Sequence, residues 1–289
     1  IKMQLSSLLS IKTGGCPENC SYCPQSAHFK TGVKRERILP KEAVLEAAQQ
    51  AQQNGATRFC MGAAWREIKD GPEFDHVLDL IREVRATGLE VCCTLGMLSE
   101  AQAQRLKDAG LYAYNHNIDS SRDFYSKIIS TRTYDDRLRT IANVRQAGLT
   151  VCTGGIIGMG ESEDDRIGFL WQLASLDPHP ESVTINSLIA VPGTPLEEQK
   201  AVTALELARV IATARVLMPK SMIRLSAGRK GLSDEGQFLC FLSGANSIFL
   251  GDKLLTSSNP SVTEDFSLLH KAGIEPSQND TLCNSSMPN

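Results

Sequence analysis

The sequence predicts a (β/α)8 barrel of the TIM type. Short apolar segments alternate regularly with helical patterns, and such alternation is typical of a parallel sheet covered by helices. Eight such units fit the length of the chain, because a barrel of this type takes about 250 residues and the chain has 289. A doubly wound open sheet is the alternative. We expect residues 1–255 to form the barrel and residues 256–289 to form a partly disordered C-terminal tail.

The expected strands are short apolar runs that precede turn residues or strand-end polar groups. They are Leu5–Lys12, Arg58–Met61, Glu90–Leu95, Tyr112–Asn117, Thr150–Gly155, Ser182–Leu188, Met222–Leu225 and Ser247–Leu250.

The expected helices show apolar residues at helical spacing and begin or end at recognisable signals. Pro40 opens the first, and Gly88 ends the second. Ser99 with Gln102 and Thr203 with Glu206 have the spacing of capping boxes. Further helices start at Ser162 and Ser233, and another carries Leu138, Ile141 and Val144. In the helix after Ser162 we expect Ile167, Leu170 and Leu173 to face inward, and in the helix after Ser233 we expect Phe238, Leu239 and Leu242 to pack on the core.

Composition and charge exclude several classes of protein. The chain is 42% hydrophobic and 22% charged, which is ordinary for a globular protein. A net charge of -3 gives no indication of a nucleic-acid surface. No apolar run approaches the roughly 20 residues of a membrane span. We expect a cytoplasmic protein, or one of the mitochondrial matrix if a leader precedes Ile1.

Three cysteines lie close together after the first strand. Cys16, Cys20 and Cys23 have the spacing C-x3-C-x2-C, and thiolates bind iron–sulfur clusters or zinc. Structural zinc sites close with four ligands, whereas no nearby fourth Cys or suitably spaced His follows these three. Three ligands therefore favour an iron–sulfur cluster with one open iron, and structural zinc is the alternative.

Other cysteines and one arginine fall on later strands. Cys60, Cys152 and Arg224 lie on strands two, five and seven, and the adjacent Cys92 and Cys93 lie on strand three. Neighbours in a strand point to opposite faces, so only one of this pair can enter the barrel. Taken one by one, Cys60 and Cys152 are more typical of buried apolar-like cysteines, and Arg224 of an arginine that balances an anionic cluster or substrate. Together, these residues make a second, inner metal site the alternative interpretation. Cys240 is expected in the core and Cys283 in the tail.

Polar residues also lie at strand ends, which converge at the mouth of a barrel. Asp119 has the chemistry to hold a ribose diol, with an exposed loop carboxylate as the alternative. Asn117 and Asn186 each carry an amide donor and acceptor that suit a urea group, with structural capping as the alternative. The segment GGIIGMGE at 154–161 is either a tight turn or a close approach to a nucleotide-like ligand.

The cysteine spacing, with Tyr22 before the last cysteine, resembles the signature of the radical S-adenosylmethionine (SAM) superfamily. The segments SIKTGGCPENCSYCPQS, TRFCMGAAW, YNHNID, RLSAGR and GANSIF resemble the biotin synthase family within it. The resemblance runs from about Leu5 to Leu255. The pair Cys92–Cys93 departs from the family pattern, as does the lack of a helical extension before the barrel.

The resemblance implies cofactors and site residues. Cys16, Cys20 and Cys23 would bind a [4Fe–4S] cluster whose open iron binds SAM. The implied ligands of an inner [2Fe–2S] cluster are Cys60, Cys92, Cys152 and Arg224. Asn117 and Asp119 would contact SAM, and Asn117 and Asn186 would contact dethiobiotin.

The implied reaction is sulfur insertion between C6 and C9 of dethiobiotin. A 5′-deoxyadenosyl radical abstracts each hydrogen, and the auxiliary cluster supplies the sulfur. The resemblance also implies a flavodoxin or ferredoxin as electron donor, and a homodimer. Another radical SAM enzyme without sulfur insertion, or a non-enzymatic iron–sulfur scaffold, is the alternative function.

Overall fold

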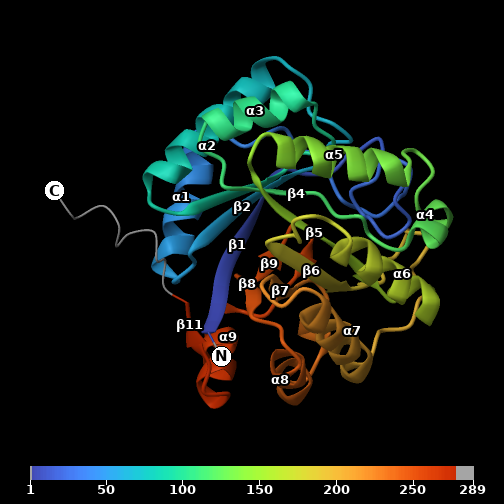
Figure 1. The fold of residues 1–289 in the computed structure, drawn as a ribbon. Coiled ribbons are helices and arrows are strands. Elements are labelled where there is room, and N and C mark those ends of the chain that lie inside the picture. The colour runs from blue at the N-terminus through green and yellow to red at the C-terminus, as the bar shows by residue number, and fades with distance from the viewer. Residues whose placement is uncertain (1, 278–289) are drawn as a thin grey trace.

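The barrel predicted from the sequence is confirmed. A computed structural model describes residues 2–277, in which eight parallel strands pair in sequence order and β1 also pairs with β8. The first and last strands therefore close the sheet on itself, which rules out the open doubly wound alternative. The helices surround the barrel (Figure 1).

The barrel strands are β1 Lys2–Lys12, β2 Arg58–Ala63, β3 Glu90–Thr94, β4 Ala113–Asn115, β5 Thr150–Ile157, β6 Ser182–Ser187, β7 Met222–Leu225 and β8 Ser247–Leu250. Three two-residue strands follow: β9 Lys253–Leu254 and β10 Ser257–Ser258 form a hairpin, and β11 Glu275–Pro276 pairs with β1.

The α-helices are α1 Lys41–Gln53, α2 Pro72–Ala86, α3 Glu100–Asp108, α4 Arg122–Ile128, α5 Tyr134–Gln146, α6 Glu163–Ala174, α7 Ala204–Leu217, α8 Asp234–Leu242 and α9 Val262–Lys271. A short 3-10 helix, η1, covers Arg229–Gly231. None of the helices among residues 2–277 is both long and apolar enough to cross a membrane.

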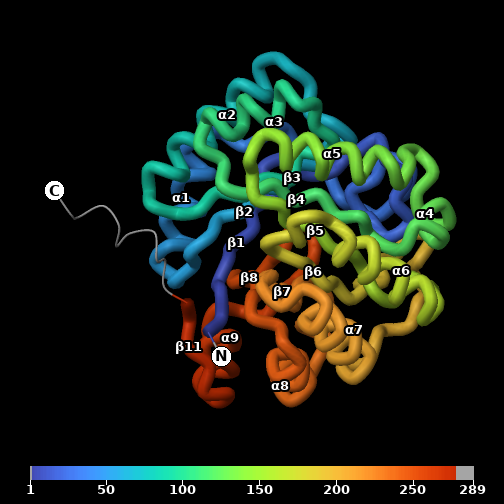
Figure 2. Tube along the Cα trace, viewed as in Figure 1, coloured from blue at the N-terminus to red at the C-terminus, as the bar shows by residue number. Residues whose placement is uncertain are grey.

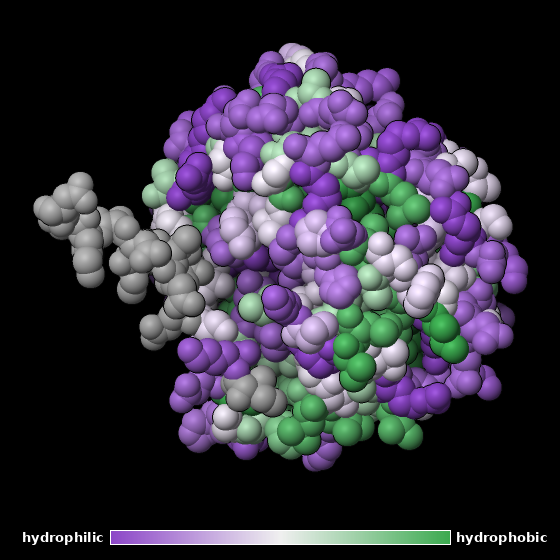
Figure 3. Space-filling model, in the orientation of Figure 1, coloured by the Kyte–Doolittle hydropathy of each residue, from purple (hydrophilic) through white to green (hydrophobic). Residues whose placement is uncertain are grey.

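The helix start signals hold, but some inward faces were predicted wrongly. The capping boxes at Ser99 and Thr203 are both formed. Ile167, however, is 63% exposed, and Leu239 and Leu242 also reach the surface. These residues follow the helical spacing, but α6 and α8 present a narrower face to the barrel than the pattern suggested. Figure 3 shows hydrophobic side chains at the surface over α7 and α8.

The C-terminal segment contains a helix that was not expected from the sequence. Residues 262–271 form α9, which begins at a complete capping box between Ser261 and Glu264. Its Leu268 and Leu269 are buried. The S-x-x-E spacing was a signal that the sequence analysis did not use. The domain boundary at residue 255 stays a prediction, and residues 278–289, including Cys283, lie outside the described part of the chain.

The loop after β1 crosses the barrel mouth and packs beside α4 and α5 (Figure 2). The backbone N–H of Ser21 donates to the carbonyl of Ile128. The Asn19 side chain accepts from the backbone N–H groups of Ser130 and Thr131. The segment after α4 therefore fixes the cysteine loop over the strand ends.

A buried ion pair holds α9 to the barrel. Arg229 donates two hydrogen bonds of 2.6 Å to the Asp265 carboxylate, and both side chains are 1% exposed. We expect Asp265→Asn to lower the free energy of unfolding by about 3–5 kcal/mol, because it leaves a buried guanidinium without its counter-charge. Urea unfolding followed by circular dichroism measures the change.

Asp234→Asn is the matched control. It breaks the 3.0 Å ion pair between Asp234 on α8 and Lys271 on α9. This pair also joins α9 to the barrel, but both of its side chains are largely exposed. Exposed pairs contribute little to stability, so we expect a small change. Equal losses in the two variants would contradict the role of Arg229 and Asp265.

Candidate active site in the barrel mouth

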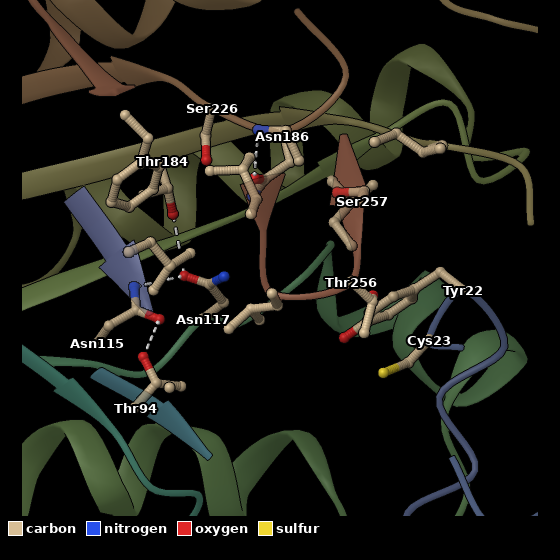
Figure 4. Close-up of a pocket in the computed structure, with 18 of the residues that line it drawn as sticks. Tyr22, Cys23, Thr94, Asn115, Asn117, Thr184, Asn186, Ser226, Thr256 and Ser257 are labelled. Atoms are coloured by element: carbon tan, nitrogen blue, oxygen red, sulfur yellow. Dashed lines mark hydrogen bonds between the residues drawn. The ribbon is translucent and has the colours of Figure 1, made fainter. Parts of the chain in front are cut away.

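A cavity of about 280 Å³ occupies the barrel and its mouth. Side chains from all eight barrel strands, the loops after them and the β9–β10 hairpin line it, and part of this lining is drawn in Figure 4. Of the residues singled out from the sequence, Cys23, Cys60, Cys92, Cys152, Asn117, Asp119, Asn186 and Arg224 line this cavity. Distant segments thus meet in one pocket, as strand ends do in barrels.

Three inner cysteines face this cavity. Cys60 on β2 pairs in register with Cys92 on β3, and Cys152 on β5 pairs with Asn115 on β4. The Asn115 amide donates to Cys152 Sγ at 3.3 Å. All three cysteines are buried without a disulfide bond.

The structure distinguishes the adjacent cysteines of β3. Cys92 lines the cavity and packs in the small inner cluster with Cys60 and Phe249. Cys93 packs in the main core, on the other face of the strand. Only Cys92 can therefore share a ligand with Cys60 and Cys152.

Electrostatics favour a thiolate at Cys60. A hydrogen bond from the Cys92 thiol lowers the pKa of Cys60, and the nearby Arg224 and Arg58 add to this effect. The same hydrogen bond, together with burial, raises the pKa of Cys92. The Cys60–Cys92 pair therefore loses its first proton more easily than its second, and a bound metal would displace that second proton.

Arg224 is a buried cation that lacks a carboxylate partner among the described residues. Its side chain is 1% exposed. It donates to Ser247 at 2.9 Å, to Ser6 at 3.1 Å and to Gln4 at 3.3 Å, and its guanidinium lies 4.4 Å from the centre of the Phe249 ring. Buried charges are normally paired, so the position suits an anionic group bound beside the inner cysteines.

The outer cysteines lie in the loop over the mouth. Cys23 lines the cavity, Cys20 is 5% exposed, and Cys16 is half-buried. A turn brings Cys20 and Cys23 together, since the N–H of Cys23 donates to the carbonyl of Cys20 at 2.9 Å. Burial raises the pKa of Cys23 to about 12 and also raises that of Cys16 and Cys20. Ligand-free, these thiols keep their protons.

A buried ion pair supports this loop from beneath. Glu18 is 2% exposed, and Arg132 lies 3.7 Å from one of its oxygens. Arg132 also points a guanidinium nitrogen at Cys20 Sγ, 3.9 Å away. Among residues 2–277, the buried atoms Glu18 Oε1 and Arg132 Nε have no hydrogen-bond partner. The loop thus presents three free thiols beside a cation, which suits a net-anionic cluster.

The donor set fits polynuclear clusters better than a single ion. Within residues 2–277, no three Cys, His, Asp or Glu side chains converge on one ion position. In an iron–sulfur cluster the cysteines are distributed over more than one iron atom and need not all converge on a single position. Each cysteine group has three thiols and a buried arginine close by, so the residues present fit iron–sulfur clusters, which thiolates hold.

Asp119 is not the exposed loop carboxylate of the alternative interpretation. It is 3% exposed, forms an ion pair with the buried Arg137, and lines the cavity. Its φ of 67° is the only positive value at a non-glycine residue in 2–277. This strained conformation often marks a binding residue. Arg137 also donates to Tyr125, so the carboxylate is held from behind.

Asn117 and Asn186 differ in which side-chain hydrogen-bonding groups remain available to a ligand. The Asn117 oxygen accepts from Asn115 and Thr184, so the side chain keeps its amide donors and not a free acceptor (Figure 4). Asn186 donates to the carbonyl of Gly155 and accepts from the N–H of Ala227. The capping interpretation therefore holds in part for Asn186, while Asn117 presents donors to the cavity.

The glycines of GGIIGMGE pack against protein. A β carbon at Gly154 would lie 2.0 Å from the Thr184 carbonyl oxygen, and one at Gly155 would lie 2.3 Å from that of Asp119. Glu161 accepts from the N–H groups of Gly158 and Met159. From this segment Ile156 lines the cavity. The glycines therefore let β5 approach the Asp119 backbone.

Sequence reasoning missed several cavity hydroxyls. Thr94, Thr184, Ser226, Thr256 and Ser257 all line the cavity. In Figure 4, Thr256 and Ser257 lie on the same side as Tyr22 and Cys23. Their position in the sequence could have indicated Thr256 and Ser257, since both follow the last barrel strand, β8.

Two family models match the chain. One described as the radical SAM superfamily matches residues 10–170, and one described as the biotin and thiamin synthesis associated domain matches residues 184–275. The first covers more than half of the chain.

Curated relatives are similar over nearly the whole chain. The biotin synthase of Myxococcus xanthus is 64% identical over 275 residues, which is 95% of this chain and 80% of the relative. The biotin synthase of Cytophaga hutchinsonii is 58% identical over 96% of this chain and 82% of the relative.

Solved structures share the fold at low sequence identity. Methylornithine synthase superposes with a TM-score of 0.80 at 18% identity, over 97% of this chain and 85% of that chain. HydG, a maturase of the [FeFe]-hydrogenase, gives a TM-score of 0.82 at 17% identity, over 96% and 64% of the two chains.

Proposed function

The chain belongs to the biotin synthase family of radical SAM enzymes, and on that premise we propose that it inserts sulfur between C6 and C9 of dethiobiotin. One observation carries the proposal. Three thiols lie in the loop over the mouth, and three more lie inside the barrel beside Arg224, on either side of one cavity.

We propose that Cys16, Cys20 and Cys23 hold a [4Fe–4S] cluster. Cys60, Cys92, Cys152 and Arg224 would hold a [2Fe–2S] cluster. When bound, the outer cluster supplies the electron for SAM cleavage and the inner cluster supplies the sulfur atom. The buried Arg224 and the largely buried Arg132 support these assignments, because each places a cation beside a group of proposed thiolate ligands.

Asp119 and Asn117 are the proposed contacts to SAM. The carboxylate of Asp119 is fixed by Arg137, and a fixed carboxylate suits the two hydroxyls of a ribose. Asn117 adds free amide donors beside it. Because Cys23 lies at the same cavity, SAM bound here would reach the open iron.

Asn117 and Asn186 are the proposed contacts to the ureido ring of dethiobiotin. The free donors of Asn117 suit the ureido carbonyl oxygen. The hydroxyls of Thr256 and Ser257 suit the substrate carboxylate, since hydroxyls donate to anions. Substrate held between these groups would lie between the outer and inner cysteines.

The proposed reaction replaces one hydrogen at C9 and one at C6 by a single sulfur atom, with 5′-deoxyadenosyl radicals as the hydrogen acceptors. The chain's part is to exclude water and fix the two carbons near the sulfur source. Apolar Leu8, Ile156, Phe249 and Leu254 line the same cavity and support this role.

We further propose a flavodoxin or ferredoxin as electron donor, a homodimeric assembly and a cytoplasmic location. The exposed apolar side chains Trp171, Leu205 and Leu242 support a protein contact over α6 to α8.

Anaerobic reconstitution tests the proposed function. We expect iron and sulfide in the amount of one [4Fe–4S] and one [2Fe–2S] cluster per chain, with two distinct absorption spectra, and biotin formed from dethiobiotin and SAM. A single cubane cluster, or zinc alone, would contradict the proposal.

A further inference from the structure

The segment 30–37 places an exposed group of cations directly against the outer cysteine loop. Lys30, Lys34, Arg35 and Arg37 are all exposed, and Glu36 is the only carboxylate among these eight residues. Within residues 2–277 none of the four cations takes part in an ion pair. The chain as a whole carries a net charge of -3, so this cationic segment is a local feature.

Backbone contacts fix the cationic segment next to Cys16. The N–H of Glu36 donates to the carbonyl of Thr13 at 2.9 Å, and Leu39 donates to Ile11 at 2.8 Å. A β carbon at Gly15 would lie 2.8 Å from Arg35 Cδ, and one at Gly14 would lie 2.7 Å from the Lys34 carbonyl oxygen. The two glycines that precede Cys16 thus let the segment lie in van der Waals contact with the loop.

The three outer cysteines differ in what they face. Cys23 lines the cavity and Cys20 is buried against Arg132. Cys16 is half-buried and is not part of the cavity wall, so it lies on the outer side of the loop, next to the cationic segment. An electron that enters from solution without crossing the substrate cavity would therefore enter on the Cys16 side.

We propose that the cationic segment is the docking surface for the electron donor, and that this donor is a small acidic protein with a one-electron flavin or iron–sulfur group. The inference rests on the proposed function, which requires a cluster at Cys16, Cys20 and Cys23. In each transfer the donor loses one electron and the outer cluster gains it. Unpaired surface cations of this kind steer an acidic partner and accelerate its association.

Stopped-flow mixing of the reconstituted enzyme with reduced flavodoxin tests the proposal. Bleaching of the cluster absorbance reports the rate of electron transfer. We expect Lys34→Glu/Arg37→Glu to slow the second-order reduction by about tenfold or more at low salt. The rate of the unaltered protein should fall steeply with salt, and that of the variant should not, because salt screens exposed charges.

Lys2→Glu/Lys220→Glu is the matched control, since it reverses two exposed cations at the opposite end of the barrel and changes the net charge equally. We expect its rate to stay within about twofold of the unaltered protein, because steering depends on where the charge lies. Equal slowing in both variants, or no slowing in either, would overturn the docking surface.

Photoreduced deazaflavin is a small electron donor that needs no docking surface. It therefore distinguishes a loss of docking from damage to the cysteine loop. All variants should assemble the cluster, accept electrons from this small donor and then cleave SAM. If the Lys34→Glu/Arg37→Glu variant does not assemble the cluster or does not accept electrons from deazaflavin, the Lys30→Glu variant is tested instead, because Lys30 lies farther from Gly15 along the segment. Normal flavodoxin-driven reduction of that variant would overturn the proposal, while a missing cluster in the unaltered protein would instead contradict the proposed function.

Discussion

Cys152→Ala is expected to abolish biotin formation while leaving SAM cleavage intact. Cys152 faces the cavity on β5, where Asn115 donates to its sulfur, and it is far in the sequence from the outer cysteine loop. Loss of this thiol removes one proposed ligand of the inner cluster only. Biotin formation should fall by more than about 100-fold, since even indirect supports of a metal ligand are typically worth about 10- to 100-fold.

The measurement combines a biotin assay with quantification of 5′-deoxyadenosine and of iron. Cys93→Ala is the control, because Cys93 is equally buried but lies in the core behind the strand. It should keep both clusters and form biotin, with at most a loss of stability. Normal biotin formation by Cys152→Ala would show that the inner cysteines are not the sulfur site.

Cys20→Ala is expected to remove the outer cluster and with it all SAM cleavage. Cys20 is the most buried of the three loop thiols, and it lies against Arg132. Without its thiolate, two ligands remain in the loop. Iron and sulfide should fall by the equivalent of one cubane cluster, and both 5′-deoxyadenosine and biotin should fall below detection. The inner cluster should keep its absorption spectrum.

Cys240→Ala is the control for this variant. Cys240 lies on α8, is fully buried and belongs to the core. Its replacement should leave the iron content and SAM cleavage unchanged. If Cys20→Ala still cleaved SAM at the normal rate, the radical chemistry would have to be assigned to another site.

The sequence predicted the barrel well because the alternation of strands and helices is a local pattern. The strand positions of Cys60, Cys152 and Arg224 then placed them together, since barrel topology brings strand residues to one interior. The residues alone could not show which of Cys92 and Cys93 faces the barrel interior. The answer depends on which face of β3 turns inward, and both faces of a barrel strand are buried.

The side-chain partners could not be predicted. The sequence suggested Asp119 as a binding carboxylate but not its ion pair with Arg137, because that pair joins residues that a helix separates. The side-chain oxygen of Asn117 is already occupied as an acceptor, because it accepts a hydrogen bond from Thr184 on another strand. Helix α9 was missed although the sequence carries its signals, namely the capping box between Ser261 and Glu264 and an apolar face that buries Leu268 and Leu269.

The contacts of Arg224 also determine when the inner site can form during synthesis of the chain. Arg224 donates hydrogen bonds to Gln4 and Ser6, which precede it by 220 and 218 residues, and β1 finds its second neighbour within the barrel only in β8. A chain still emerging from the ribosome lacks β8 and Ser247, so it cannot hold the guanidinium in place. Pairings at such sequence separation form late. The proposed inner site is therefore complete only after β8 has been synthesised and has paired with β1.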